Sequence, residues 1–284
     1  MIGKSAAAPH IPAMRLPTLF IPHGGGPCFF LNPDGTCPPM WVRMRDYLAG
    51  LIADLPERPR AILLVSGHWE ETNFTVHAGR QPGLLFDYYG FPAHTYQIRW
   101  DAPGAPEIAE RVRDLLEQAG FPTRMETARG WDHGVFVPMK VADPEADIPL
   151  VQLSLRTDLD PADHIKAGQA IAALRDEGVL IVGSGMSFHN LRAYRAPGTL
   201  ELSARFDDAL ADAATDPDPE RRFARLTDWQ KLPDARFSHP REEHLLPLMV
   251  AAGAGAESDA RHDFRDEVLG SVVSAFRFGA NAPT

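Results

Sequence analysis

The feature that most constrains the fold is a set of four short apolar segments that each end abruptly in glycine or polar residues. These segments are residues 16–22, 61–65, 150–155 and 179–182. Buried parallel strands have this pattern, because helices cover both faces of a parallel sheet and the strands lead directly into loops. We therefore expect the four segments to form strands of one sheet.

Amphipathic segments with helical spacing lie between these predicted strands. Residues 106–119 and 161–177 each begin near a proline and end near a glycine, as helices commonly do. Residues 201–229 are expected to form two helices, a further helix is expected to begin near Pro240, and a last strand is expected at 272–278. This alternation predicts an α/β fold with a central, largely parallel or mixed sheet flanked by helices.

The composition is that of an ordinary globular protein. Of the 284 residues, 44% are hydrophobic and 23% are charged, so the chain can bury a sizeable core without disulfides. No change in composition marks a domain boundary, and we expect residues 16–284 to form one domain after a flexible segment of residues 1–15. Cys28 and Cys37 match neither a zinc motif nor a redox pair, which favours a cytoplasmic location.

Charge and hydropathy exclude two classes of partner. The 28 Lys and Arg residues against 38 Asp and Glu residues give a net charge of −10, which argues against nucleic acid. The longest apolar run, residues 245–256, contains Pro247 and is well short of the ~20 residues that span a bilayer. We therefore expect no membrane contact and a small-molecule partner, with the protein a monomer or a homo-oligomer.

Two histidines directly follow predicted strands. His23 precedes three glycines, and His68 lies between Gly67 and Trp69. Ligands of α/β proteins bind in the crevice outside the carboxyl ends of the strands, so both histidines are candidates for a site there. The alternative is that both are loop histidines that stabilise tight turns.

A third candidate ligand lies near the predicted start of the Pro240 helix. His244 follows Glu242 and Glu243, so a helix terminus would bring a third nitrogen or a carboxylate to the same crevice. Three such protein ligands leave positions open for substrate and oxygen, which is typical of non-haem Fe(II), and the same ligand types suit Zn²⁺. Alternatively, the two glutamates only complement the helix dipole and His244 caps a surface.

Two further histidines, His133 and His189, lie in glycine-rich or strand-end segments. Imidazole titrates near neutral pH, so either residue could transfer protons, with Asp132 or Asn190 orienting its ring. Ser184 lacks the flanking pattern of a nucleophile elbow, which disfavours a serine hydrolase.

Seven short motifs, in order along the chain, resemble those of the class III extradiol ring-cleaving dioxygenases. The resemblance is to the group that includes 4,5-DOPA dioxygenase and is related to the catalytic subunit of protocatechuate 4,5-dioxygenase. The motifs lie at residues 17–27, 66–70, 86–92 with Tyr96, 131–138, 149–155, 183–191 and 243–247. They include Tyr-Gly-Phe-Pro at 89–92 and Glu-His-Leu-Leu-Pro at 243–247, and they span most of the predicted catalytic domain.

This resemblance implies roles for the five histidines. His23, His68 and His244 are implied to hold the metal, although a glutamate is the third ligand in the protocatechuate branch, so Glu242 or Glu243 is an alternative to His244. His189 is implied to act as acid or base beside the metal and can be an additional zinc ligand. His133 is implied to contact the substrate or move protons.

The activity implied by the resemblance is ring opening of a catechol with O₂ to a muconic semialdehyde, dependent on Fe(II). Zn²⁺ suits the same ligands and is an expected occupant of the isolated protein. Trp69, Tyr89 and Phe91 are expected to contact the substrate together with His133. Two alternatives are a zinc-dependent hydrolase on the same site and a non-enzymatic binding protein similar to the adaptor Memo.

Overall fold

The computed structural model describes residues 15–256 and 259–279, so the expected flexible segment lies outside the described residues apart from Arg15. The strands are β1 (Thr18–Pro22), β2 (Ala61–Glu71), β3 (Phe74–His77), β4 (Thr123–Glu126), β5 (Leu150–Arg156), β6 (Val179–Gly185), β7 (Ala260–Val268) and β8 (Ser271–Phe278). The α-helices are α1 (Val42–Gly50), α2 (Pro106–Gln118), α3 (His133–Ala142), α4 (Pro161–Ile171), α5 (Thr199–Ala214), α6 (Pro219–Thr227), α7 (Ala235–Ser238) and α8 (Leu246–Ala254).

All eight strands form one sheet in the order β4-β3-β5-β2-β6-β1-β8-β7. The four strands predicted from apolar segments, β5, β2, β6 and β1, are parallel neighbours at its centre. Strand β8 pairs antiparallel with β1 and with the edge strand β7, and β3 pairs antiparallel with β5. The predicted α/β fold with a mixed sheet and flanking helices is confirmed.

Alternate residues of the central strands contribute to two separate cores, one on each face of the sheet. In β2, Leu63 and Val65 belong to one core, whereas Ile62 and Leu64 belong to the other. This alternation follows from the two-residue period of a strand, and it explains why the central strands are apolar on both faces.

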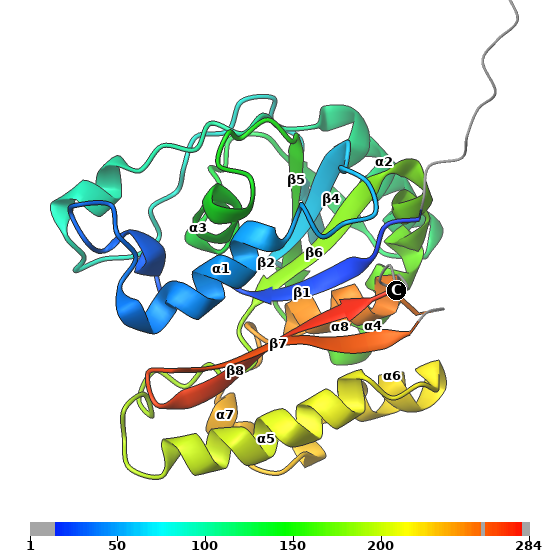
Figure 1. Ribbon diagram of the computed structural model, residues 1–284. Coiled ribbons are helices and arrows are strands. Elements are labelled where there is room, and N and C mark those ends of the chain that lie inside the picture. The colour runs from blue at the N-terminus through cyan, green and yellow to red at the C-terminus, as the bar shows by residue number, and fades with distance from the viewer. Residues whose placement is uncertain (1–14, 257–258, 280–284) are drawn as a thin grey trace, which may run out of the picture.

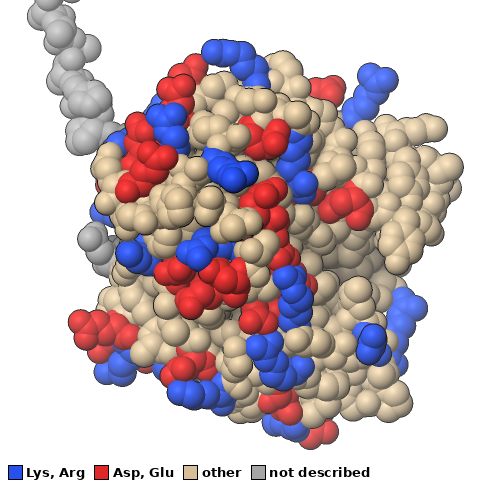
Figure 2. Space-filling model, turned by 180° about the vertical axis from the view of Figure 1, so that it is seen from behind, with Lys and Arg blue, Asp and Glu red and all other residues tan. Residues whose placement is uncertain are grey.

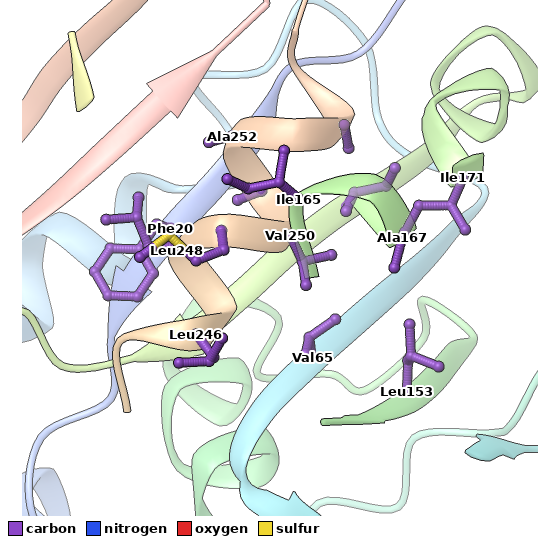
Figure 3. Packing of buried hydrophobic residues seen from close by; sticks show 14 of the residues in the cluster. Phe20, Val65, Leu153, Ile165, Ala167, Ile171, Leu246, Leu248, Val250 and Ala252 are labelled. Atoms are coloured by element: carbon purple, nitrogen blue, oxygen red, sulfur yellow. The ribbon is translucent and has the colours of Figure 1, made fainter. Parts of the chain in front are cut away.

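Helices cover both of these faces (Figure 1). Residues of α2, α4 and α8 contribute to the first core, in which Ile165 and Ala167 of α4 lie beside Val250 and Ala252 of α8 (Figure 3). The second core lies under α1 and α3, and α5 packs along the β7–β8 hairpin. None of the helices in the described ranges is long and apolar enough to cross a membrane.

Three element predictions need correction. The helix expected near Pro240 begins only at Leu246, because the N–H groups of Leu245 and Leu246 bond to the carbonyl of Glu242 and form a separate turn before Pro247 enters the first helical turn. His244 lies in that turn rather than in a helix. The segment 161–177 divides into α4 and a 3₁₀ helix, and β2 continues past His68 to Glu71 with an irregularity after Val65.

Candidate active site

Five histidines from separate parts of the chain line one cavity, which has a volume of about 180 Å³. The cavity lies where the parallel strands end, as expected for an α/β protein. One follows β1, one lies within β2, one begins α3, one follows β6 and one precedes α8; in this order they are His23, His68, His133, His189 and His244.

Three of these histidines direct ring nitrogens toward one point. The Nε2 atom of His68 lies 3.2 Å from Nε2 of His23 and 3.1 Å from Nε2 of His244. Nitrogens that bind one zinc ion at about 2.0–2.1 Å are separated by about 3.0–3.4 Å, so the spacing fits a shared metal ion. One ring nitrogen from each of His23, His68 and His244 lies within 4.8 Å of the other two, close enough for one metal ion to bind all three.

The partners on the other ring nitrogens favour the same conclusion. The hydroxyl of Ser184 donates to the carbonyl of Gly134, so its oxygen accepts the Nδ1–H of His23 at 3.1 Å. Glu243 Oε1 lies 2.9 Å from Nδ1 of His244 and accepts its hydrogen. With the hydrogens on Nδ1, the Nε2 lone pairs face one another, and a bound cation would satisfy them.

Burial keeps these rings neutral, as metal ligation requires. Desolvation, followed by the neighbouring histidines, lowers the pKa of His23 and of His244 well below 6.5. Desolvation and the proximity of His133 lower the pKa of His68 to about 3. The three imidazoles are therefore uncharged at neutral pH, each with one nitrogen free of hydrogen.

The remaining two histidines adjoin this group, His133 beside His68 and His189 beside His244, and each is held by a carboxylate. Asp87 Oδ1 lies 2.8 Å from Nδ1 of His133, and Glu243 Oε1 lies 3.1 Å from Nδ1 of His189. The ring of His189 stacks on that of His244, with centroids 3.4 Å apart. In both cases Nδ1 is the nitrogen that the carboxylate fixes.

These partners differ from those expected, because neither Asp132 nor Asn190 orients a catalytic candidate. The amide of Asn190 donates to the carbonyl of Phe237. Asp132 is fully buried and accepts hydrogen bonds from Ser66 at 2.8 Å and from Gln152 at 2.5 Å. Its carboxylate therefore holds the Ser66 hydroxyl, which accepts the backbone N–H of His68 at 3.1 Å, rather than a histidine ring.

Gly67 allows the two halves of the site to approach. A Cβ atom at this position would lie 3.1 Å from the carbonyl oxygen of Glu243 and 3.2 Å from Cα of His244. The glycine before His68 thus permits close packing of β2 against the turn that carries His244.

The expected substrate contacts are mostly displaced from the cavity. Tyr89 is 91% exposed, and Trp69 is buried beneath the guanidinium of Arg129. Phe91 lies behind Gly26, where a Cβ would meet its ring at 2.7 Å. Of these expected contacts, His133 alone lines the cavity; besides the histidines, its walls are formed by Gly24, Gly25, Gly26, Trp41, Leu191, Tyr194 and Leu269.

Few sequence patterns predict the residues that form these cavity walls. Leu191 belongs to the His-Asn-Leu motif, but Trp41, Tyr194 and Leu269 lie in segments without any recognisable pattern. Asp87 precedes the Tyr-Gly-Phe-Pro motif, yet nothing in its spacing indicates that its carboxylate meets His133.

A second, open hollow of about 520 Å³ adjoins the cavity and shares His189 and Leu191 with it. Arg192 and Arg241 also line this hollow. Arg241 is paired with Glu70 and Glu243, whereas the Arg192 side chain has no ion-pair partner among the described residues. Acidic and basic side chains are otherwise interspersed over the face seen in Figure 2.

Comparison with known proteins gives consistent matches. The family described as the catalytic LigB subunit of aromatic ring-opening dioxygenase matches residues 17–276. The chain is 37% identical to dioxygenase tasH of Hapsidospora irregularis, covering 93% of this chain and 86% of that protein. It is 40% identical to a 4,5-DOPA dioxygenase extradiol of Beta vulgaris, covering 77% of this chain and 81% of the relative.

A solved structure agrees with these sequence matches. The crystal structure of an uncharacterized protein from Escherichia coli K12 superimposes with a TM-score of 0.75 at 29% sequence identity, covering 93% of this chain and 100% of that one. The family match extends over most of the chain and includes all five histidines of the cavity. The chain belongs to the family of catalytic LigB subunits of aromatic ring-opening dioxygenases, and it is a class III extradiol dioxygenase of the 4,5-DOPA dioxygenase-like group.

Proposed function

We propose that this enzyme uses a non-haem Fe(II) ion to open the ring of a catechol with O₂, giving a muconic semialdehyde. The observation that carries the proposal is the convergence of three Nε2 atoms, in which that of His68 lies 3.2 Å from that of His23 and 3.1 Å from that of His244. Three protein ligands leave coordination positions open, as non-haem iron oxygenases require.

In this proposal the three histidines hold the metal, and His133 and His189 move protons. A bound iron would supply the redox chemistry that joins catechol and O₂. Nδ1 of each proton-transfer residue is held by a carboxylate, so Nε2 is the atom that exchanges a proton. His133, beside His68, accepts the catechol proton, and His189, beside His244, returns a proton.

The carboxylates behind these residues remain ionised at neutral pH. Burial raises the pKa of Glu243, but its hydrogen bond with His189 and the nearby charges outweigh burial, and the net pKa is lowered. Burial also raises the pKa of Asp87, but its hydrogen bonds with His133 and the charges of His133 and His68 outweigh burial, so the net pKa is lowered. Each carboxylate thus stabilises the imidazolium that forms when its histidine takes up a proton.

The cavity volume supports a substrate with a single aromatic ring. An engineered apolar cavity of ~150 Å³ binds benzene, and the cavity beside the histidines measures about 180 Å³. The open hollow next to it accommodates a substituent, and the guanidinium of Arg192 favours one that carries a carboxylate. The names of several relatives refer to DOPA, a catechol with such a side chain.

Oxygen uptake by metal-free protein reloaded anaerobically with Fe(II) tests the proposal. The panel should contain DOPA, protocatechuate, gallate and unsubstituted catechol, with the visible spectrum recorded for a coloured semialdehyde. Uptake coupled to colour is the expected result. No uptake with iron confirmed in the site would overturn the proposal and favour a zinc-dependent hydrolase or a binding protein on the same scaffold.

A further inference from the structure

The turn between β7 and β8 contains an unusual residue. Val268 pairs with Ser271, so only Leu269 and Gly270 join the two strands. Their φ angles are 54° and 75°. Two-residue turns of this kind favour Asn-Gly or Asp-Gly, because a left-handed backbone brings the Cβ of other residues against the following carbonyl oxygen. Leucine in the first position is therefore strained.

The strained leucine lies at the cavity. Leu269 lines the same space as the five histidines. The other described non-glycine residues with positive φ do not line it; they are Ala146, Leu159, Arg195 and Asp234. Strain at a functional site persists where the surrounding structure holds the residue in place, so the position of Leu269 points to a use for its side chain.

Hydrogen bonds hold the turn in position. The backbone N–H of Arg195 donates to the carbonyl of Leu269 at 2.8 Å, and the hydroxyl of Ser271 donates to the carbonyl of Val268 at 2.9 Å. The N–H of Val272 donates to the hydroxyl of Ser203 in α5 at 3.0 Å. The tip of the hairpin is therefore fixed against its neighbours, and Leu269 presents a rigid apolar surface to the cavity.

We propose that Leu269 is a specificity-determining residue, whose side chain forms the apolar wall that contacts the aromatic ring of the substrate and limits its substituents. The inference rests on the proposed function, since it takes the ring to be a catechol. A turn-favouring asparagine would place a polar amide on this wall, whereas leucine excludes water and complements an aromatic ring. Among the described residues, Leu269 is thus the strained position that lines the cavity, and it carries leucine instead of the residue that such turns prefer.

Two substitutions of Leu269 test the role of its side chain, one that removes the apolar surface and one that keeps it. Leu269→Asn relieves the strain and removes the apolar wall, so we expect the melting temperature to rise by about 2 °C or more and the KM for catechol to rise about tenfold. Leu269→Met keeps an apolar side chain of similar volume, so its KM for catechol should rise much less than that of Leu269→Asn. The ratio of kcat/KM for catechol and 4-tert-butylcatechol should change more in the asparagine variant than in the methionine variant.

Ala146→Asn serves as the matched control, because Ala146 has a φ of 56° and does not line the cavity. It should raise the melting temperature without changing KM. The assignment is overturned if Leu269→Asn stabilises the enzyme but leaves both KM and the ratio between the two catechols unchanged.

A binding measurement distinguishes failure of this inference from failure of the proposed function. Absorbance titration of zinc-loaded protein with 4-nitrocatechol requires no turnover, and Leu269→Asn should weaken binding about tenfold. If binding weakens in this way but no variant consumes O₂, the wall assignment stands and the proposed reaction is wrong. If the unmodified protein turns over catechol and binding is equal in all variants, the wall assignment is wrong.

Discussion

Two carboxylates each connect a pair of histidines in the cavity. Asp87 lies 2.8 Å from His133 and 3.5 Å from His68, and Glu243 lies within 3.1 Å of both His189 and His244. Each pair combines one proposed metal ligand with one proposed proton-transfer residue. A change at either carboxylate therefore affects metal binding and proton transfer together.

Alanine substitutions separate these two roles. His189→Ala should retain metal and still bind catechol, but kcat should fall about 10²–10⁴-fold because a proton-transfer group is lost. His23→Ala should lose the metal, because one of three converging nitrogens is removed. Metal analysis after gel filtration and steady-state oxygen uptake measure the two effects.

Equal loss of metal in both variants would contradict the separation of roles. In that case His189 would be a fourth ligand, consistent with its proximity to His244 and Glu243.

Arg192 provides a prediction about substrate charge. Arg192→Gln should raise the KM for a catechol with a carboxylate side chain about tenfold, since it removes a charge-assisted hydrogen bond, and leave unsubstituted catechol unaffected. Arg124→Gln is the matched control, because Arg124 on β4 also has no ion-pair partner in the part of the chain that the structure describes. An equal rise in KM for both catechols would show that Arg192 stabilises the fold rather than binding the substituent.

At the level of single residues, sequence reasoning found the five histidines but not their partners. Histidines after apolar strands, and inside recognisable motifs, stand out locally. Asp87 contacts His133, and Glu243 contacts His189 besides its neighbour His244. No local pattern encodes the contacts with His133 and His189, which are remote in the chain. Tyr89 belongs to a motif and is nevertheless exposed, because the motif includes the turn at Gly90, whose φ is 77°.

At the level of elements, the apolar strands β1, β2, β5 and β6 were predictable because both of their faces are buried. The edge strand β4 and the polar strand β7 were not, because strands that are exposed on one side lack the continuous apolar run. Helix α3 was also missed, since its sequence is apolar on nearly all sides and contains Pro138. Because residues 242–246 form a separate turn, α8 begins later than predicted and His244 lies outside a helix.

The contact between β6 and α8 gives a prediction about stability. A Cβ on Gly183 would lie 2.2 Å from the carbonyl oxygen of Pro247, so the helix and strand would have to separate. Gly183→Ala should lower the free energy of unfolding by about 1–3 kcal/mol, as overpacking typically does. Because α8 follows His244 directly, metal affinity should fall as well.

Gly83→Ala is the control, since a Cβ there meets no atom within 4 Å. Urea unfolding compares the variants. A Gly183→Ala protein as stable as the Gly83→Ala protein would show that α8 can shift without cost.

At the level of the whole molecule, buried neutral histidines make stability depend on pH. Burial lowers the pKa of His239 to about 4 and, together with His133, that of His68 to about 3, from 6.5 in the unfolded chain. Between those values and pH 6.5 the unfolded state binds more protons than the folded state, so the free energy of unfolding rises with pH. Metal-free protein should therefore lose stability as the pH falls from 6.5 toward 4 and be nearly constant above 7.

Urea unfolding at pH 7.5, 6 and 5 measures this dependence. His239 lies outside the metal group and donates from Nε2 to the carbonyl of Ser187, a bond that a glutamine can replace. His239→Gln should thus have a smaller loss between pH 7.5 and 5 than the unmodified protein. An equal loss of stability in both proteins would show that groups other than His239 cause the pH dependence.

The position of β1 has a consequence for biosynthesis. Thr18 of this early strand lies opposite Ile181 on one side and Phe278 on the other. A chain emerging from the ribosome therefore carries an apolar strand that has no neighbours until much later segments are translated, which makes it a region for chaperones to shield. His244 and Leu269, which line the cavity, are translated long after His23. A chain that stops before residue 244 therefore has neither the closed cavity nor all three of the proposed metal ligands.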